Sequence, residues 1–142
     1  MAYRYGRTSQ LRLSTAHQYL QALFVAALAD PDCPVDITIL CGHRTLEEQA
    51  DLYAQGRTRP GPIVTRAKPG QSTHNHYPSL AVDAAPYVGG KVSWDWSHYN
   101  ILAPHIKATW ARLKASGEVE GDLVWLGDST GFREGPHWQL EL

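Results

Sequence analysis

Two parts of the chain hold the residue types from which catalytic metal sites are built. One short stretch contains His74, His76 and Asp83, and His137 follows much later in the sequence. Two imidazoles and one carboxylate are three ligands for a catalytic zinc ion, which leaves its fourth position to water. Glu134, three residues before His137, supplies a carboxylate that can take a proton from that water. The pattern therefore predicts a zinc-dependent hydrolase.

Asp83 is the most informative of these residues because it interrupts the apolar run 80–85. Burying a lone carboxylate costs several kcal/mol unless it is paired or bound to a cation. Asp83 could also begin a turn and face water, but the histidines close to it in sequence favour metal binding. Glu134 and His137 flank a Gly-Pro turn. Alone, they would suggest a solvated glutamate and a histidine packed on Trp138, whereas together with the first stretch they favour a metal site.

The order of predicted helices and strands suits a single small α+β domain over residues 1–142. One helix is predicted at 14–29 with Ser14 as N-cap, and a second from the Thr45–Glu48 capping box to Gly56, its C-terminal stop. A third is predicted at 97–117, with Ser97 as cap and Gly117 at the end, and Pro104 lies in its first turns or offsets its start. Strands are predicted at 35–39, 80–85, 123–126 and 137–142, with a Gly89-Gly90 hairpin within 87–92 and a surface loop at 57–71.

The totals exclude several classes of protein. The net charge is −1 and no long basic run occurs, so nucleic acid is not an expected partner. No apolar run approaches the ~20 residues of a membrane span, and the N-terminus lacks the apolar region of a signal peptide. We expect a monomer that is made in the cytoplasm and does not insert into membranes. Cys33 and Cys41 lack the Cys-x-x-Cys spacing, and a cytoplasmic protein keeps its thiols reduced, so we expect two buried free thiols, with a disulfide as the alternative.

Three motifs in order resemble those of the peptidoglycan-cleaving zinc peptidases, which include D-alanyl-D-alanine carboxypeptidases and phage L-alanyl-D-glutamate endopeptidases. They are Gly42-His43-Arg44-Thr45-Leu46-Glu47-Glu48-Gln49, then Ser72-Thr73-His74 leading to Ala81-Val82-Asp83, and finally Glu134-Gly135-Pro136-His137. The resemblance implies the fold that these peptidases share with Hedgehog-type domains, an antiparallel sheet flanked by helices, with the zinc site at the sheet. It covers most of the chain, from about residue 35 onward.

The resemblance leaves two alignments of the central motif. The family places six residues between its histidine and its aspartate, a spacing that His76 has relative to Asp83. The family serine, however, stands two places before its histidine, which matches Ser72 and His74. A Pro-Ser variant of the motif, similar to that of a subgroup of phage endolysins, favours His74 as the ligand, with His76 as the alternative.

The resemblance also implies roles for individual residues. His74, Asp83 and His137 would hold Zn2+, and Glu134 would transfer the proton. Arg44 would stabilise the oxyanion, although a salt bridge with Glu47 or Glu48 is an equal alternative. Gln49, Ser72 and His76 would contact the substrate or support the site. The many tryptophans and tyrosines could fill the core or line a groove.

The resemblance implies an endolysin that cleaves the L-alanyl-D-glutamate bond of peptidoglycan and causes host lysis. Small size and the missing secretion signal suit an enzyme that is released through a holin-type pore and acts in the periplasm and cell wall, with no separate wall-binding domain. One alternative is a D-Ala-D-Ala carboxypeptidase or dipeptidase, whose cationic pocket would use Arg57, Arg59, Arg66 and Lys68. The other is a non-catalytic, zinc-stabilised wall-binding module.

Overall fold

The structure, a computed structural model that describes residues 3–142, contains one antiparallel sheet of five strands. In chain order the elements are α1 (Arg7–Leu13), α2 (Gln18–Ala29), β1 (Asp36–Cys41), α3 (Leu46–Ala54), the 3-10 turn η1 (Thr73–Asn75), β2 (Ala81–Val88), β3 (Lys91–Val92), α4 (Trp96–Ala115), β4 (Asp122–Trp125), the 3-10 turn η2 (Leu126–Asp128) and β5 (His137–Glu141). The strand order is β1-β2-β5-β4, and β3 pairs with β2. All pairings between these strands are antiparallel, which confirms the predicted fold class.

Side chains along β2 and β5 point alternately to the two faces of the sheet, so one face packs in the core and the other carries the candidate site. Val82 lies opposite Trp138, and both side chains are buried in the core. Asp83 lies opposite His137 in the same ladder. Because successive side chains of a strand point to opposite faces, Asp83 and His137 leave the sheet together on the face away from Val82 and Trp138.

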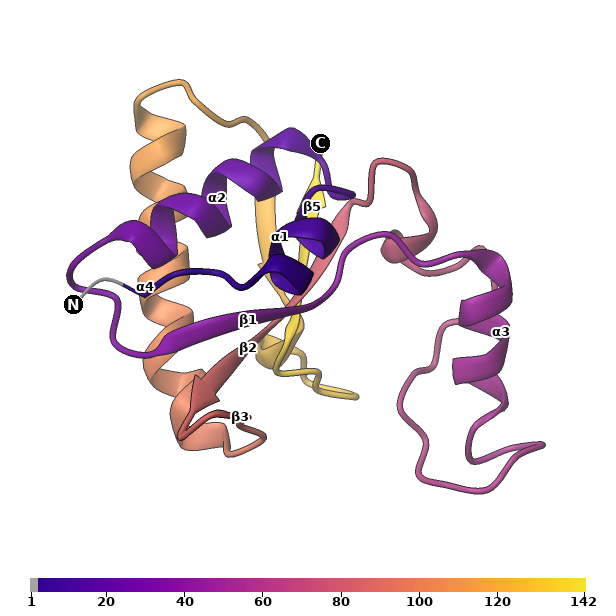
Figure 1. Cartoon of the computed structure of the whole chain (residues 1–142). Helices are drawn as coiled ribbons and strands as arrows, with labels where there is room; N and C mark the ends of the chain where they lie inside the picture. Colours follow the sequence, from indigo (N-terminus) through magenta and orange to yellow (C-terminus); the bar gives the residue numbers. More distant parts are fainter. Residues whose placement is uncertain (1–2) are drawn as a thin grey trace.

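The core joins this sheet to α1, α2 and α4. The apolar face of α2 is fully buried, with Leu20, Leu23 and Phe24 at 0% exposure. Figure 1 shows α2 and α4 beside the sheet. α3 and the loop after it lie on the right of the view, beyond the C-terminal end of β1. Within residues 3–142, no helix has both the length and the apolar character needed to cross a membrane.

The N-terminal helical region differs from the prediction. The predicted helix 14–29 starts later, as α2 at Gln18, and an unpredicted helix, α1, precedes it and ends at Leu13. His17 rather than Ser14 caps α2 by accepting a hydrogen bond from the Tyr19 amide at 3.1 Å. The segment between α1 and α2 is held by a residue that is distant in the sequence. Ser79 donates its amide to the Thr15 carbonyl at 2.9 Å and accepts from the His17 amide at 2.8 Å, so the backbone between the helices pairs with a later segment.

The other helix ends follow local rules with one exception. Thr45 and Glu48 form the predicted capping box, with bonds of 2.9 and 3.1 Å. Gly117 follows the C-terminal end of α4 with a φ of 81°. The predicted start of α4 is wrong: Asp95 is the N-cap and accepts from the Ser97 amide at 2.9 Å. Pro104 lies inside the helix, beyond its first turns, and does not offset its start.

Candidate metal and catalytic site

The sheet fixes the spacing of two predicted ligands. Asp83 on β2 and His137 on β5 are direct partners in the ladder, and the Ala84 amide donates to the Pro136 carbonyl at 2.9 Å beside them. His137 Nδ1 lies 3.4 Å from Asp83 Oδ1. Two side chains on opposed ladder positions hold a separation that the backbone hydrogen bonds set, which gives the rigidity that metal coordination requires.

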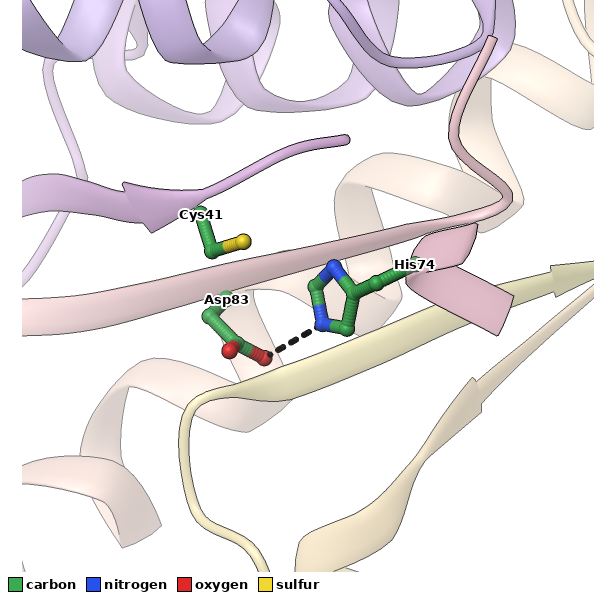
Figure 2. A group of neighbouring side chains, drawn as sticks. All are labelled: Cys41, His74 and Asp83. Carbon is green, nitrogen blue, oxygen red and sulfur yellow. Dashed lines mark hydrogen bonds and ion pairs between the residues drawn. The ribbon is translucent and has the colours of Figure 1, made fainter. Parts of the chain in front are cut away.

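The third predicted ligand, His74, comes from the turn η1. Ser72 Oγ accepts from the His74 amide at 3.2 Å and starts the turn. The backbone of Arg44 stabilises this turn. The Arg44 amide donates to the His74 carbonyl at 2.8 Å, and the Arg44 carbonyl accepts from the Asn75 side chain at 3.0 Å. The His74 ring is 1% exposed, and its Nε2 lies 3.1 Å from Asp83 Oδ1, as Figure 2 shows.

Hydrogen bonds behind the two imidazoles determine which nitrogens face Asp83. His74 Nδ1 lies 2.7 Å from the Gly42 carbonyl oxygen, which only accepts, so Nδ1 carries the proton. His137 Nε2 lies 2.9 Å from Gln139 Oε1, and the amide nitrogen of Gln139 donates to Glu141. The free lone pairs of neutral His74 and His137 therefore converge with a carboxylate oxygen of Asp83. Three converging acceptors form a site for a cation, and outer hydrogen bonds of this kind orient metal-binding histidines.

Charge reinforces this geometry. Burial favours the neutral form of Asp83, but the adjacent imidazoles outweigh it and hold the pKa of Asp83 well below its usual range. Burial likewise disfavours a charged His74, yet the Asp83 carboxylate raises the pKa of His74 above its ordinary value. The negative charge that attracts a proton to His74 also attracts a metal cation, which would displace that proton. Two nitrogens and one carboxylate oxygen fit a three-ligand zinc site.

Cys41 also lies at this cluster, a position that the sequence pattern did not predict. Suitable donor atoms of Cys41, His74 and Asp83 all lie within 4.8 Å of one another, and Figure 2 shows the three side chains together. The ladder shifts register between Ile39 and Cys41, so that Cys41 rather than Leu40 opposes Asp83. A β-bulge re-aims side chains in this way. Cys41 is half-buried and Cys33 buried, and both thiols are free as predicted.

Arg44 and Gln49 form a second layer against Asp83. Arg44 Nη2 lies 3.4 Å from Asp83 Oδ2, and its Nη1 donates to Gln49 Oε1 at 2.8 Å. Arg44 therefore pairs with Asp83, whereas Glu48 is engaged in the capping box. Gln49 is 0% exposed and also donates to the Ala67 carbonyl at 2.7 Å. Its buried side chain is thus placed to orient Arg44 and the following loop, which corresponds to the supporting role among those expected for it.

Ser72 and His76, the other two residues expected to contact the substrate, lie in different places. Ser72 lines a hollow beside the cluster and starts the turn that carries His74. His76 does not reach the site: its side chain is exposed, and its carbonyl accepts from His43 Nδ1 at 2.9 Å. The η1 turn directs His74 inward and leaves His76 on the surface. The expectation that His76 contacts the substrate or replaces His74 as ligand is therefore not supported by its position.

Two hollows meet at the cluster, with volumes of about 370 and 210 Å3. Arg44, Asp83, Glu134 and His137 line both of them. Glu134 is half-buried, and burial raises the pKa of its carboxyl, an effect that His137 opposes and Asp83 strengthens. Its carboxylate therefore borders open space beside the converging donors, the position that a general base requires.

Some aromatic side chains fill the core and others line the larger hollow, the two possibilities that the sequence left open. Trp125 and Trp138 stack in the core with ring centroids 5.5 Å apart. Trp94 and Trp96 line the larger hollow together with Tyr99. The sequence pattern alone did not separate the two groups, because which tryptophans reach the hollow depends on how α4 meets the sheet.

The basic residues of loop 57–71 do not form the cationic pocket that the alternative carboxypeptidase or dipeptidase would use. Arg57 donates to the Tyr53 and Thr65 carbonyls at 2.6 and 3.1 Å, and Arg59 pairs with Asp51 at 3.2 Å. In the described part of the chain, none of the four basic residues of this loop lines either hollow at the cluster.

Gly42→Ala should lower both stability and metal affinity. An added Cβ would overlap the Arg12 carbonyl oxygen and the Thr15 hydroxyl, and the Gly42 carbonyl also orients His74. Overpacking of this kind costs about 1–3 kcal/mol. Thermal unfolding followed by circular dichroism measures the loss. Gly6→Ala is the control because no atom lies within 4 Å of its added Cβ. Equal melting temperatures for the two variants would disprove the close approach at Gly42.

Comparison with known proteins places this geometry in a family. The family model described as phage L-alanyl-D-glutamate peptidase matches residues 1–140. The peptidoglycan L-alanyl-D-glutamate endopeptidase CwlK of Bacillus subtilis is 35% identical over 107 residues, which cover 75% of this chain and 61% of that protein. The L-alanyl-D-glutamate peptidase of Escherichia phage T5 is 31% identical over 123 residues, 87% of this chain and 76% of that one.

Two solved structures share the fold. The L-Ala D-Glu endopeptidase ChiX of Serratia marcescens matches with a TM-score of 0.68 and 22% identity, over 97% of this chain and 90% of that one. A variant of the vancomycin resistance D,D-pentapeptidase VanY, in complex with Zn(II), matches with a TM-score of 0.53 and 24% identity, over 92% and 71% of the two chains. The match of the family model along nearly the whole sequence shows that this chain belongs to the phage L-alanyl-D-glutamate peptidase family.

Proposed function

We propose that this protein is a zinc-dependent endopeptidase that hydrolyses the L-alanyl-D-glutamate bond of peptidoglycan. The observation that carries the proposal is the convergence of His74, Asp83 and His137 beside Glu134, in a cleft that a peptide can enter. The activities named for CwlK and the phage T5 peptidase support the choice of bond. The chain spans 61% of CwlK, so the activity and substrate are inferred from the shared region.

The ligand set that we propose is His74 Nε2, His137 Nδ1 and a carboxylate oxygen of Asp83. The hydrogen bonds to Gly42 and Gln139 leave these two nitrogens unprotonated in the neutral rings. When bound, zinc polarises the scissile carbonyl and lowers the pKa of a coordinated water towards ~7. Three protein ligands leave a position for that water, as catalytic zinc sites require.

Glu134 moves the proton in this mechanism. It takes a proton from the attacking water, whose oxygen forms a bond to the carbonyl carbon of L-alanine. The bond from that carbon to the nitrogen of D-glutamate then breaks, and Glu134 passes the proton to the leaving amine. The position of Glu134 on the wall of both hollows supports this role, because a substrate in the cleft lies on the same side as its carboxylate.

Arg44 supplies positive charge where the carbonyl oxygen becomes negative. Its guanidinium is held by Gln49 at 2.8 Å and by Asp83 at 3.4 Å, so it needs little reorganisation during the reaction. A fixed donor of this kind stabilises a developing oxyanion. Gln49 and Ser72 act on the reaction indirectly, through Arg44 and His74.

The site of action that we propose is the cell wall, reached after synthesis in the cytoplasm. The peptidoglycan named for CwlK supports this location. A substrate of this kind is a large polymer, and the two hollows that meet at the cluster are open enough to admit a stem peptide from the surface.

Mass spectrometry of purified muropeptides tests the proposed function. Incubation with the zinc-loaded protein should release a disaccharide that bears L-alanine and a peptide that begins with D-glutamate. Removing the metal with a chelator should abolish both products, and adding zinc back should restore them. Loss of one or two D-alanine residues instead would identify a carboxypeptidase or dipeptidase. Tight zinc binding without cleavage would indicate a wall-binding module.

A further inference from the structure

Arg133 holds a fixed positive charge next to Glu134. Its guanidinium carbon lies 3.9 Å from the ring centroid of Trp96, and its Nε donates to the Gly127 carbonyl at 2.9 Å. Both Arg133 and Trp96 line the larger hollow. The side chain is exposed, but stacking and the hydrogen bond constrain the plane of the guanidinium.

The charge of Arg133 is not neutralised by the protein. Arg44 is the other basic residue that lines the larger hollow, and Arg44 pairs with Asp83. Arg133 forms no ion pair within residues 3–142, and in that part of the chain its two terminal nitrogens form no hydrogen bond. A guanidinium with free, coplanar N–H groups matches a carboxylate through two parallel hydrogen bonds.

Tyr99 gives a separate indication that the larger hollow receives a polar ligand. It lines this hollow and is 4% exposed, yet its hydroxyl has no hydrogen-bond partner in the described residues. Buried polar atoms nearly always have a partner, so an unpartnered hydroxyl beside a cleft points to a group that binds there. The Trp96 ring lies next to both residues: its centroid is 5.7 Å from that of the Tyr99 ring, and the Arg133 guanidinium stacks on it.

The proposed substrate carries a group that fits Arg133. A glutamyl residue has two carboxyl groups, and only one of them enters the bond to the next residue of a stem. The other remains a carboxylate within a few bonds of the nitrogen that leaves when the L-alanyl-D-glutamate bond breaks. Glu134 serves that nitrogen in the proposed mechanism, and Arg133 is its neighbour in the chain.

We propose that Arg133 binds the free carboxylate of the D-glutamyl residue and thereby sets the preference of the enzyme for an unamidated stem. The larger hollow is then the subsite for the leaving side of the scissile bond, with the Trp96 face as its floor. This inference rests on the proposed endopeptidase function, and the experiment below separates the failure of one from the failure of the other.

Two synthetic stem peptides test the proposal. They differ only in the free carboxyl group of D-glutamate, which is a carboxylate in one and a carboxamide in the other. The wild-type enzyme should favour the carboxylate in kcat/KM by about tenfold to a hundredfold, the range expected when one charged hydrogen-bonded pair is lost. Arg133→Gln should bring this ratio close to one, mainly by slowing the carboxylate peptide. Arg133→Lys should give an intermediate ratio, because lysine keeps the positive charge but lacks the two parallel N–H donors of the guanidinium.

Arg66→Gln is the matched control. Arg66 also lies over an aromatic ring, 5.2 Å from the centroid of Phe132, but it does not line the larger hollow. Its loss should leave the ratio at the wild-type value. Equal slowing of both peptides by Arg133→Gln, or an unchanged ratio, would overturn the assignment, and so would a wild-type ratio near one. Failure of the wild-type enzyme to cut either peptide would reject the endopeptidase function itself.

Discussion

Glu134→Gln should reduce hydrolysis of the stem peptide by about a hundredfold to ten-thousandfold, the usual contribution of a general base. Glutamine has the same shape as glutamate but cannot accept a proton from water. Glu134 does not belong to the converging donor set of His74, Asp83 and His137, so the variant should keep its metal and its fold.

Rate and metal content measured on the same preparation check this expectation. The readouts are kcat for muropeptide cleavage and zinc per chain by plasma mass spectrometry. Glu120→Gln is a suitable control because Glu120 is exposed and lines neither hollow. Full activity in Glu134→Gln would mean that another group takes the proton. Loss of zinc would mean that Glu134 is itself a ligand.

His74→Ala should abolish metal binding, with an affinity loss of more than about a hundredfold, because even outer-layer changes at such sites cost ten- to a hundredfold. The ring is 1% exposed and contributes one of the three converging atoms. His76→Ala should keep the metal, since the His76 side chain is exposed and lines neither hollow at the cluster. Equilibrium dialysis against zinc measures both variants, and the reverse result would exchange the roles of the two histidines.

Cys41→Ser completes this experiment. Cys41 lies close to the cluster, but its thiol faces the Gly42 carbonyl oxygen at 3.5 Å and the His43 carbonyl oxygen at 3.9 Å. A thiol that donates to carbonyls is protonated, whereas a metal ligand is a thiolate. The serine variant should therefore bind zinc like the wild type. A marked loss of affinity would add Cys41 to the ligand set.

Features that depend on neighbouring residues were predictable from the sequence. The capping box of Thr45 and Glu48 and the Gly89-Gly90 hairpin form from contacts within a few residues. Asp83 was recognisable because a carboxylate within an apolar run requires a partner, and the structure supplies imidazoles. The opposition of Asp83 and His137 follows from pairing β2 with β5, which the α+β pattern allowed but did not specify.

Features that depend on distant contacts were not predictable. α2 starts at Gln18 rather than Ser14, because the backbone of Thr15 and His17 pairs with Ser79, and no local periodicity indicates that pairing. Cys41 reaches the cluster only because the ladder shifts register after Ile39. Arg133 lies in a stretch without periodic signal, and its relation to Trp96 exists only after α4 packs beside the sheet.

The position of β5 in the sheet has a consequence for the order in which the molecule becomes active. β5 follows the other strands in the sequence but lies between β2 and β4, so the sheet closes by insertion at its centre. During synthesis, His74 and Asp83 leave the ribosome well before His137 and Glu134, so the proposed third ligand and the proposed general base are made last. In the proposed assignment, the pairing of β5 with β2 therefore both completes the sheet and brings the last proposed ligand beside the others.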